Sequence, residues 1–148
     1  MKESQHEVFL ALGSNLGDGR ANIHRAIELI QERIGDVVRQ SSLIVTEPWG
    51  FESSNSFVNG ACMCLTSLTP MQLLRSTQQI EREMGRTQKS TQRLMPDGTT
   101  KAVYHDRIID IDILTYDDLH IHTPELTLPH PHMHERDFVM IPLEEIKK

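Results

Sequence analysis

The sequence predicts an α+β protein in which two helices pack on one face of a β-sheet. Three observations support this fold class. Strand-like and helix-like segments follow one another in the order βαββαβ, with a C-terminal extension after them. Most of the connections between these segments are short. The chain has 148 residues, enough to bury a core of its own, and we expect a single domain over residues 1–148.

The first half of the chain contains three predicted strands and one helix. Residues 8–12 (VFLAL) form a short apolar strand that ends in a Gly-Ser-Asn turn. Asp18 can cap a helix whose isoleucines recur at helical spacing, and Gly35 closes it. Two further strands are expected, over 37–46 and 57–65.

The second helix has the clearest boundaries. Thr69 suits the N-cap, Pro70 the first helical position, and Gln72 completes a capping box. Apolar residues then mark one face of the helix until Gly85 stops it. The sequence therefore predicts a helix that begins at Pro70.

The rest of the chain supplies the fourth strand and the extension. The strand is 106–114 (DRIIDIDIL), followed by a small hairpin over 119–130 and a short helix around 140–146. The polar residues 87–103 have no convincing periodicity and are expected to form a long loop. Together these elements predict a ferredoxin-like sandwich whose second sheet face is free to carry a site.

Composition excludes several classes of protein. Hydrophobic residues make up 38% and charged residues 24%, as in ordinary soluble domains. No apolar run approaches the ~20 residues needed to span a bilayer, and we expect a cytoplasmic protein without a signal peptide. The net charge of −6 argues against general nucleic-acid binding. Cys62 and Cys64 are expected to be small, reduced and buried.

The fourth strand carries two aspartates among isoleucines. Residues two apart share a face, so Ile109, Ile111 and Ile113 would point to the core and Asp110 and Asp112 away from it. The two carboxylates would lie roughly 6–7 Å apart along the strand. Either they are solvated at a sheet edge, or they hold a cation, for which Mg²⁺ is suited by its preference for oxygen ligands.

Basic residues cluster beside the aspartates. Arg107 lies three residues before Asp110, and Arg86 and Lys89 open the polar stretch. Arginines suit phosphoryl transfer because a planar guanidinium can contact two phosphate oxygens, although a solvated basic face is the simpler interpretation. The segment GSNLG matches neither phosphate-binding glycine motif, so any ATP phosphates would be held by metal and arginines.

A third group could bind a flat heteroaromatic ligand. Phe57 and Asn59 share a strand face, and with Phe138 they could supply stacking and an amide that both donates and accepts. Core packing is the commoner role for such a phenylalanine. The histidines at 120, 122, 130, 132 and 134 could bind a transition metal, although Pro129 and Pro131 interrupt regular strand geometry, and one histidine could instead contact phosphate.

In combination these segments resemble the 6-hydroxymethyl-7,8-dihydropterin pyrophosphokinase family. The resemblance covers nearly the whole chain through segments that occur in order: LALGSNLGD (10–18), TEPWG (46–50), FVNGA (57–61), TQQIEREMGR (77–86), DRIIDIDIL (106–114) and LPHPHMHERDF (128–138). It implies a ferredoxin-like fold, two Mg²⁺ ions, and transfer of pyrophosphate from ATP to the pterin hydroxymethyl oxygen with release of AMP. It also implies a monomer acting in folate synthesis.

The resemblance also implies roles for individual residues. Asp110 and Asp112 look like the Mg²⁺ ligands, and Arg86 and Arg107 like catalytic arginines that clamp the phosphates. The positions that resemble the pterin site are Thr46, Trp49, Phe57, Asn59 and Phe138, and those that resemble the ATP site are Gln78, Glu81, Lys89, Tyr104, His130 and Arg136.

Some positions depart from the family pattern. Tyr104 stands where a tryptophan is expected, Pro131 follows His130 where a tyrosine is common, and the segment from Lys89 to Arg107 is longer. The general base stays open: Asp112 could accept the hydroxymethyl proton, or a metal-bound oxygen could lose it late. Two alternative functions come from other classes of protein. One is a nucleotide-sugar transferase that uses a D-x-D motif, and the other is a non-catalytic ferredoxin-like module that binds metal through its histidines.

Overall fold

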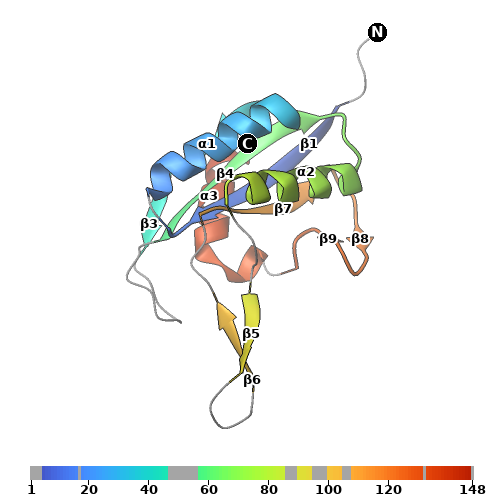
Figure 1. Ribbon diagram of the computed structural model, residues 1–148. Helices are drawn as coiled ribbons and strands as arrows, with labels where there is room; N and C mark the ends of the chain where they lie inside the picture. Colours follow the sequence, from blue (N-terminus) through green and yellow to red (C-terminus); the bar gives the residue numbers. More distant parts are fainter. Residues whose placement is uncertain are drawn as a thin grey trace.

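The structure of the protein is a computed structural model (Figure 1). It describes residues 5–16, 18–46, 57–85, 90–94, 100–104, 108–131 and 133–147, and at 46, 90–94 and 100–104 it describes the backbone. The strands are β1 (His6–Ser14), β2 (Gly35–Gln40), β3 (Ile44–Thr46), β4 (Phe57–Thr66), β5 (Ser90–Leu94), β6 (Thr100–Tyr104), β7 (Asp110–Tyr116), β8 (Ile121–His122) and β9 (Thr127–Leu128). The helices are α1 (Gly19–Arg33), α2 (Pro70–Glu83) and α3 (Asp137–Ile146), with a 3₁₀ turn η1 (Met133–Glu135).

The main sheet is antiparallel and has the strand order β2-β4-β1-β7, with β3 also paired to β4. This is the order that a βαββαβ chain gives when each helix carries the chain over one strand, so the ferredoxin-like prediction is confirmed. The stretch 37–46 was expected to be one strand. It forms two, β2 and β3: after Gln40 the Ala61 N–H donates to the side-chain Oγ of Ser41, and strand pairing with β4 resumes at Ile44.

Local signals fix both helices of the βαββαβ unit. Asp18 accepts a hydrogen bond from the Ala21 N–H at 3.1 Å, and Thr69 and Gln72 form the predicted capping box. Gly85, with φ of 102°, lies just beyond α2. Gly35 directly follows the α1 C-cap Ile34, as predicted, and it also begins β2, where a Cβ would lie 1.9 Å from the Leu65 carbonyl oxygen.

The first face of the sheet is closed by α1 and α2. Val8, Leu10 and Leu12 of β1 pack with Ile111 and Ile113 of β7 and with the apolar sides of both helices. Cys62 and Cys64 of β4 belong to the same buried cluster, and both are free thiols, as expected. This face is the hydrophobic core of the fold.

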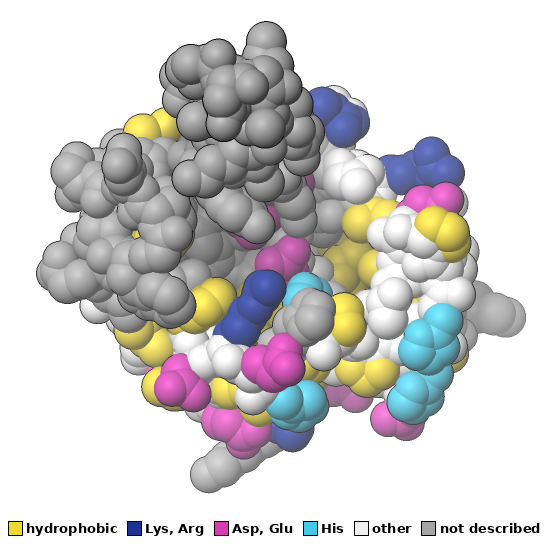
Figure 2. All heavy atoms as spheres, turned by 90° about the horizontal axis from the view of Figure 1, so that it is seen from below, with side chains coloured by type: hydrophobic (Ala, Val, Ile, Leu, Met, Phe, Trp, Pro, Cys, Tyr) yellow, Lys and Arg dark blue, Asp and Glu magenta, His cyan; other side chains and the backbone are white. Residues whose placement is uncertain are grey.

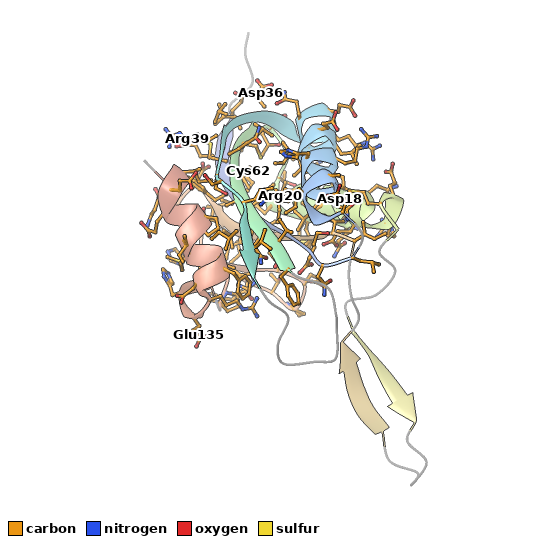
Figure 3. All side chains as sticks on the ribbon, turned by 90° about the vertical axis from the view of Figure 1, so that its left-hand side faces the viewer. Asp18, Arg20, Asp36, Arg39, Cys62 and Glu135 are labelled. Carbon is orange, nitrogen blue, oxygen red and sulfur yellow. The ribbon has the colours of Figure 1, made fainter. Side chains whose placement is uncertain are left out.

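The second face is covered by α3 along part of its length. Figure 3 shows α1 and α3 on opposite sides of the sheet, with the labelled Arg39 on the side of α3. Arg39 Nη1 donates to the carbonyl oxygen of Ile146 at 3.0 Å, and the Ser42 N–H donates to Glu145 at 2.7 Å. The buried residues of this layer form two small clusters: Ala11, Leu114, Met133, Val139 and Leu143 in one, and Ala61, Met63 and Ile146 in the other.

Two expectations for the C-terminal half need correction. The helix expected around 140–146 begins at Asp137, and it covers part of a sheet face that was expected to be free. The polar stretch 87–103 was expected to be a loop, but β5 and β6 pair over Ser90–Leu94 and Thr100–Tyr104. Figure 1 shows this hairpin standing away from the main sheet, and its sequence segments STQRL and TKAVY contain no apolar alternation that would predict strands.

The small hairpin of β8 and β9 is confirmed. In the described part of the chain, no helix is long and apolar enough to cross a membrane.

Candidate active site

The two aspartates of β7 lie on the second face of the sheet. Asp110 is opposite Gly13 of β1 and Asp112 is opposite Ala11, whereas Ile111 and Ile113 are opposite Leu12 and Leu10. Residues directly opposite one another in a sheet point to the same side, so the carboxylates face away from α1 and α2. Both aspartates are half-buried. The predicted division of this strand into a core face and an acidic face is confirmed.

A buried carboxylate of α2 holds the start of this strand. The Ile111 N–H donates to Glu81 Oε2 at 2.7 Å, and Glu81 is only 6% exposed. Ile111 is the residue between the two aspartates, so this bond ties their backbone to α2. Gln78, one turn earlier, is exposed.

Asn59 lies on the same face, two strands away from Asp110. It is opposite Gly13 in the pairing of β1 with β4, which places Asn59, Gly13 and Asp110 in one row across three strands. The Asn59 side chain is 8% exposed, and among the described residues its carboxamide makes no hydrogen bond. A buried amide without partners costs about 1–3 kcal/mol, which a polar ligand in the row would offset.

The second face of the sheet and the helix that covers part of it carry two aromatic side chains. Phe57 is two residues before Asn59 on β4, therefore on the same face, and it is half-buried. Phe138 is in the first turn of α3 and 42% exposed, with the Arg136 guanidinium 5.9 Å from the centre of its ring. These are the rings that the sequence assigned to a flat ligand.

The N-terminal end of α3 lies beside the aspartate strand. Val139 belongs to the same buried cluster as Leu114 and Ala11, the neighbours of Asp112 along and across the sheet. The His130 N–H donates to the Leu114 carbonyl oxygen at 2.9 Å, which brings His130 to the same strand. Figure 2 views the molecule from below and shows acidic, basic and histidine side chains close together on this face.

The arrangement joins an amide, aromatic rings and paired carboxylates on one sheet face. Such a face can orient a flat polar heterocycle at one end of the row and a charged group at the other. The carboxylate pair offers the hard oxygen ligands of Mg²⁺, which takes one or two protein carboxylates and completes its shell with water and phosphate oxygens.

The chain matches the family model described as 7,8-dihydro-6-hydroxymethylpterin-pyrophosphokinase over residues 9–148. It therefore belongs to this pyrophosphokinase family. A 2-amino-4-hydroxy-6-hydroxymethyldihydropteridine pyrophosphokinase of Porphyromonas gingivalis is 46% identical over 94% of this chain and 89% of its own length. The protein of the same name from Bacillus subtilis is 39% identical, over 94% of this chain and 77% of its own length.

Longer proteins contain the same family unit. The folic acid synthesis protein FOL1 of Dictyostelium discoideum is 40% identical over 94% of this chain, which spans 19% of that protein. The crystal structure of Plasmodium falciparum HPPK-DHPS has a TM-score of 0.73 at 15% identity, over 98% of this chain and 41% of that chain. At this identity the likeness shows the fold alone.

Several predicted site residues lie outside the described residues: Trp49, Arg86, Lys89 and Arg107. For two others the structure gives only backbone pairing. Thr46 of β3 is opposite Phe57, and Tyr104 of β6 is opposite Ser90. Within the described ranges, no group of three or more His, Cys, Asp or Glu side chains could hold a metal.

Sequence reasoning missed the place of two small residues in this candidate site, and one bond of a third residue. Ala11 was assigned to a strand and Gly13 to a turn, although Gly13 lies between Asn59 and Asp110, and Ala11 between Ala61 and Asp112. Glu81 was assigned to ATP by resemblance, with no indication of its bond to Ile111. Small residues two apart were visible in LALG, but only the strand register shows what stands opposite them.

Proposed function

We propose that this chain transfers the β,γ-pyrophosphoryl group of ATP to the hydroxymethyl oxygen of 6-hydroxymethyl-7,8-dihydropterin and releases AMP, a step of folate synthesis. The observation that carries the proposal is the row of Asn59, Gly13 and Asp110. At one end of this row, the buried amide of Asn59 can bind the polar edge of a heterocycle. Two strands away, the aspartate carboxylates can bind a metal ion that carries phosphate. A transferase that joins these two substrates needs both ends within one site.

The pterin would lie at the Asn59 end of the row. Its amide edge both donates and accepts hydrogen bonds, as does the Asn59 carboxamide. Phe57 and Phe138 would stack on the ring, and backbone groups of Thr46 and Trp49 would complete the contacts. Support comes from Phe57, half-buried on the sheet face of Asn59, and from Phe138, 42% exposed in the first turn of α3.

The triphosphate would lie at the aspartate end. Asp110 and Asp112 would hold Mg²⁺, two ions in our proposal, and the bound metal would neutralise charge on the phosphates. Arg86 and Arg107 would contact the transferred group as charge develops on its oxygens. Gln78, Glu81, Lys89, Tyr104, His130 and Arg136 would line the nucleotide side. We propose Asp112 as the acceptor for the hydroxymethyl proton.

We propose a cytoplasmic monomer. Two buried free thiols in one cluster fit a reducing compartment, where disulfides are rare. Equilibrium sedimentation of the purified chain tests the oligomeric state.

The reaction is tested by incubating the protein with Mg-ATP and 6-hydroxymethyl-7,8-dihydropterin and separating the nucleotides by chromatography. AMP that forms only when pterin is present supports pyrophosphoryl transfer. ADP would mean that the γ-phosphoryl group alone is moved, and the proposed bond cleavage would be wrong. Omission of Mg²⁺, with restoration by its addition, tests the metal requirement in the same assay.

A further inference from the structure

We propose that Gly13 is a positioning residue for the pterin: its lack of a side chain keeps the Asn59 carboxamide in place and leaves a bare floor between that amide and the aspartates. The inference rests on the proposed function, since it assigns the row to pterin binding. It concerns a residue that the sequence assigned only to a turn.

The backbone of Gly13 does not require glycine. It lies inside β1, and among the described glycines only Gly85 has a positive φ. A glycine within a strand is less stable there than alanine because it loses more conformational freedom and packs no side chain. In strands such a glycine often marks a close approach of another group. At Gly13 the reason must therefore be found in the space above the residue.

That space is occupied at its edge by Asn59. A Cβ on Gly13 would lie 2.9 Å from Asn59 Oδ1 and 4.0 Å from its Cγ. At 2.9 Å one of the two groups must move. Asn59 is 8% exposed, so its carboxamide has little room to move without turning its oxygen and nitrogen away from their present directions. The atom displaced is the one that would accept a hydrogen bond from the ligand.

The side chains along β1 become smaller toward this point. After Glu7, the residues of β1 on the second sheet face are Phe9, Ala11 and Gly13 in order. Phe9 packs against the clusters under α3, and Ala11 lies between Ala61 and Asp112. Gly13 then lies between Asn59 and Asp110. The sheet surface therefore carries side chains of β1 under α3, but none from Gly13 in the row proposed for the substrate.

The dimensions suit one flat ligand. Neighbouring strands are about 4.8 Å apart, so the backbones of Asn59 and Asp110 are separated by two spacings, or about 10 Å. A planar ring held at the Asn59 edge would cross above Gly13, and its exocyclic hydroxymethyl group would point toward the aspartates. A methyl group at position 13 would stand in this path.

The experiment compares Gly13→Ala with Gly60→Ala. Gly60 is in the adjacent strand β4 and faces the other side of the sheet, where a Cβ would meet the terminal Cδ2 of Leu43 at 2.7 Å. Both variants add one methyl group to a central strand. Binding of 6-hydroxymethylpterin, a stable probe, is measured by calorimetry, alongside KM for ATP and the thermal midpoint.

We expect Gly13→Ala to weaken pterin binding by at least about tenfold, with KM for ATP changed less than about twofold. Gly60→Ala should keep pterin affinity, whatever it does to the thermal midpoint. In an Asn59→Ala background, Gly13→Ala should cause little further loss, because the group that it displaces is gone.

Three results would overturn the inference: normal pterin affinity in Gly13→Ala, an equal loss in Gly60→Ala, or the full loss repeated in the Asn59→Ala background. If the wild-type protein binds no pterin and forms no AMP, the proposed function itself is wrong. A wild-type protein that binds pterin, beside a Gly13→Ala variant that binds it equally well, overturns the role of Gly13 alone.

Discussion

The two faces of the sheet are formed by the same strands but differ in composition: one is an apolar core and the other carries the polar row. On the face under α1 and α2, alternate residues of β1 and β7 are buried aliphatic side chains in one continuous cluster. On the other face, the intervening residues change from apolar contacts under α3 to Asn59, Gly13 and Asp110 beyond it. Figure 3 shows the sheet between these two layers.

The difference shows how a small fold can separate stability from chemistry. Because successive residues of a strand point to opposite faces, Ile111 can anchor the core while Asp110 and Asp112 stay available to a ligand. The separation is incomplete at one point, where Glu81 reaches from α2 to the Ile111 N–H. Substitutions on the two faces should therefore change different measured quantities, and Glu81 should change both.

Asp112→Asn should give the largest effect. It keeps the shape of the side chain and removes the charge that would hold the metal, so we expect kcat to fall by about three orders of magnitude, or about 4 kcal/mol in the barrier. Pterin affinity and the thermal midpoint should hardly change. Steady-state AMP production measures kcat, and Asp118→Asn, an exposed carboxylate just after β7, is the matched control. Near-normal turnover would remove Asp112 from the metal site.

Leu10→Ala tests the other face of the same strands. Leu10 is 0% exposed, and its truncation should lower the free energy of unfolding by about 3 kcal/mol through lost burial and a residual cavity. The kcat of the folded fraction should stay within about twofold, because the residue points away from the row. Urea unfolding gives the free energy, with Leu119→Ala as a control at a side chain that is 44% exposed. A large fall in kcat without loss of stability would mean that the two faces are coupled.

Glu81 tests the connection between the faces. Glu81→Ala leaves the Ile111 N–H without this acceptor and should cost about 2 kcal/mol of stability. If the bond positions the aspartates, the Mg²⁺ concentration for half-maximal rate should also rise, and Glu81→Gln, which keeps an acceptor oxygen, should restore most of both losses. Glu32→Ala, exposed on α1, controls for loss of a glutamate. A loss of stability with unchanged Mg²⁺ dependence would restrict Glu81 to the core.

We expect the smallest effect at Glu83 of α2, whose carboxylate forms an exposed ion pair with Arg33 of α1. Its carboxylate accepts a hydrogen bond from Arg33, which lowers the pKa of Glu83 from the ordinary value of 4.5. Because the pKa of Glu83 is lower in the folded state, its ionised form adds stability at pH values above 4.5. This stability is lost as the pH falls through the pKa of the folded state. Glu83→Gln should therefore lower the thermal midpoint slightly near neutral pH and not at about pH 2.

Glu28→Gln is the control for Glu83, since Glu28 pairs with Arg25 at 3.9 Å on an exposed part of α1. A pH-independent difference for Glu83→Gln would contradict the charge-based explanation. The same substitution should leave AMP production unchanged, because the pair lies outside the row.

Much of the fold could be predicted because its signals are local. The caps at Asp18 and Thr69 depend on residues within one turn, and the alternation in DIDIL depends on residues two apart. The hairpin of β5 and β6 was missed because the segments STQRL and TKAVY contain no apolar alternation.

The site could be predicted only in part, for a different reason. Alternation shows that Asn59 and Asp110 each lie on one face of a strand, but the register of three strands brings them into one row with Gly13. Register is set by pairings between residues far apart in the chain, which a periodic pattern does not contain. The hydrogen bond from Ile111 to Glu81 likewise joins residues 30 apart in the chain, and no local sequence pattern predicts it.

Cys62 and Cys64 make opening of the fold measurable by a chemical reaction. Burial raises the pKa of both thiols, that of Cys64 to about 12, so neither is a thiolate near neutral pH in the folded state. A reagent that alkylates thiolates can therefore react only when the helix layer opens. The rate of alkylation therefore reports how often the layer of α1 and α2 opens above these two thiols.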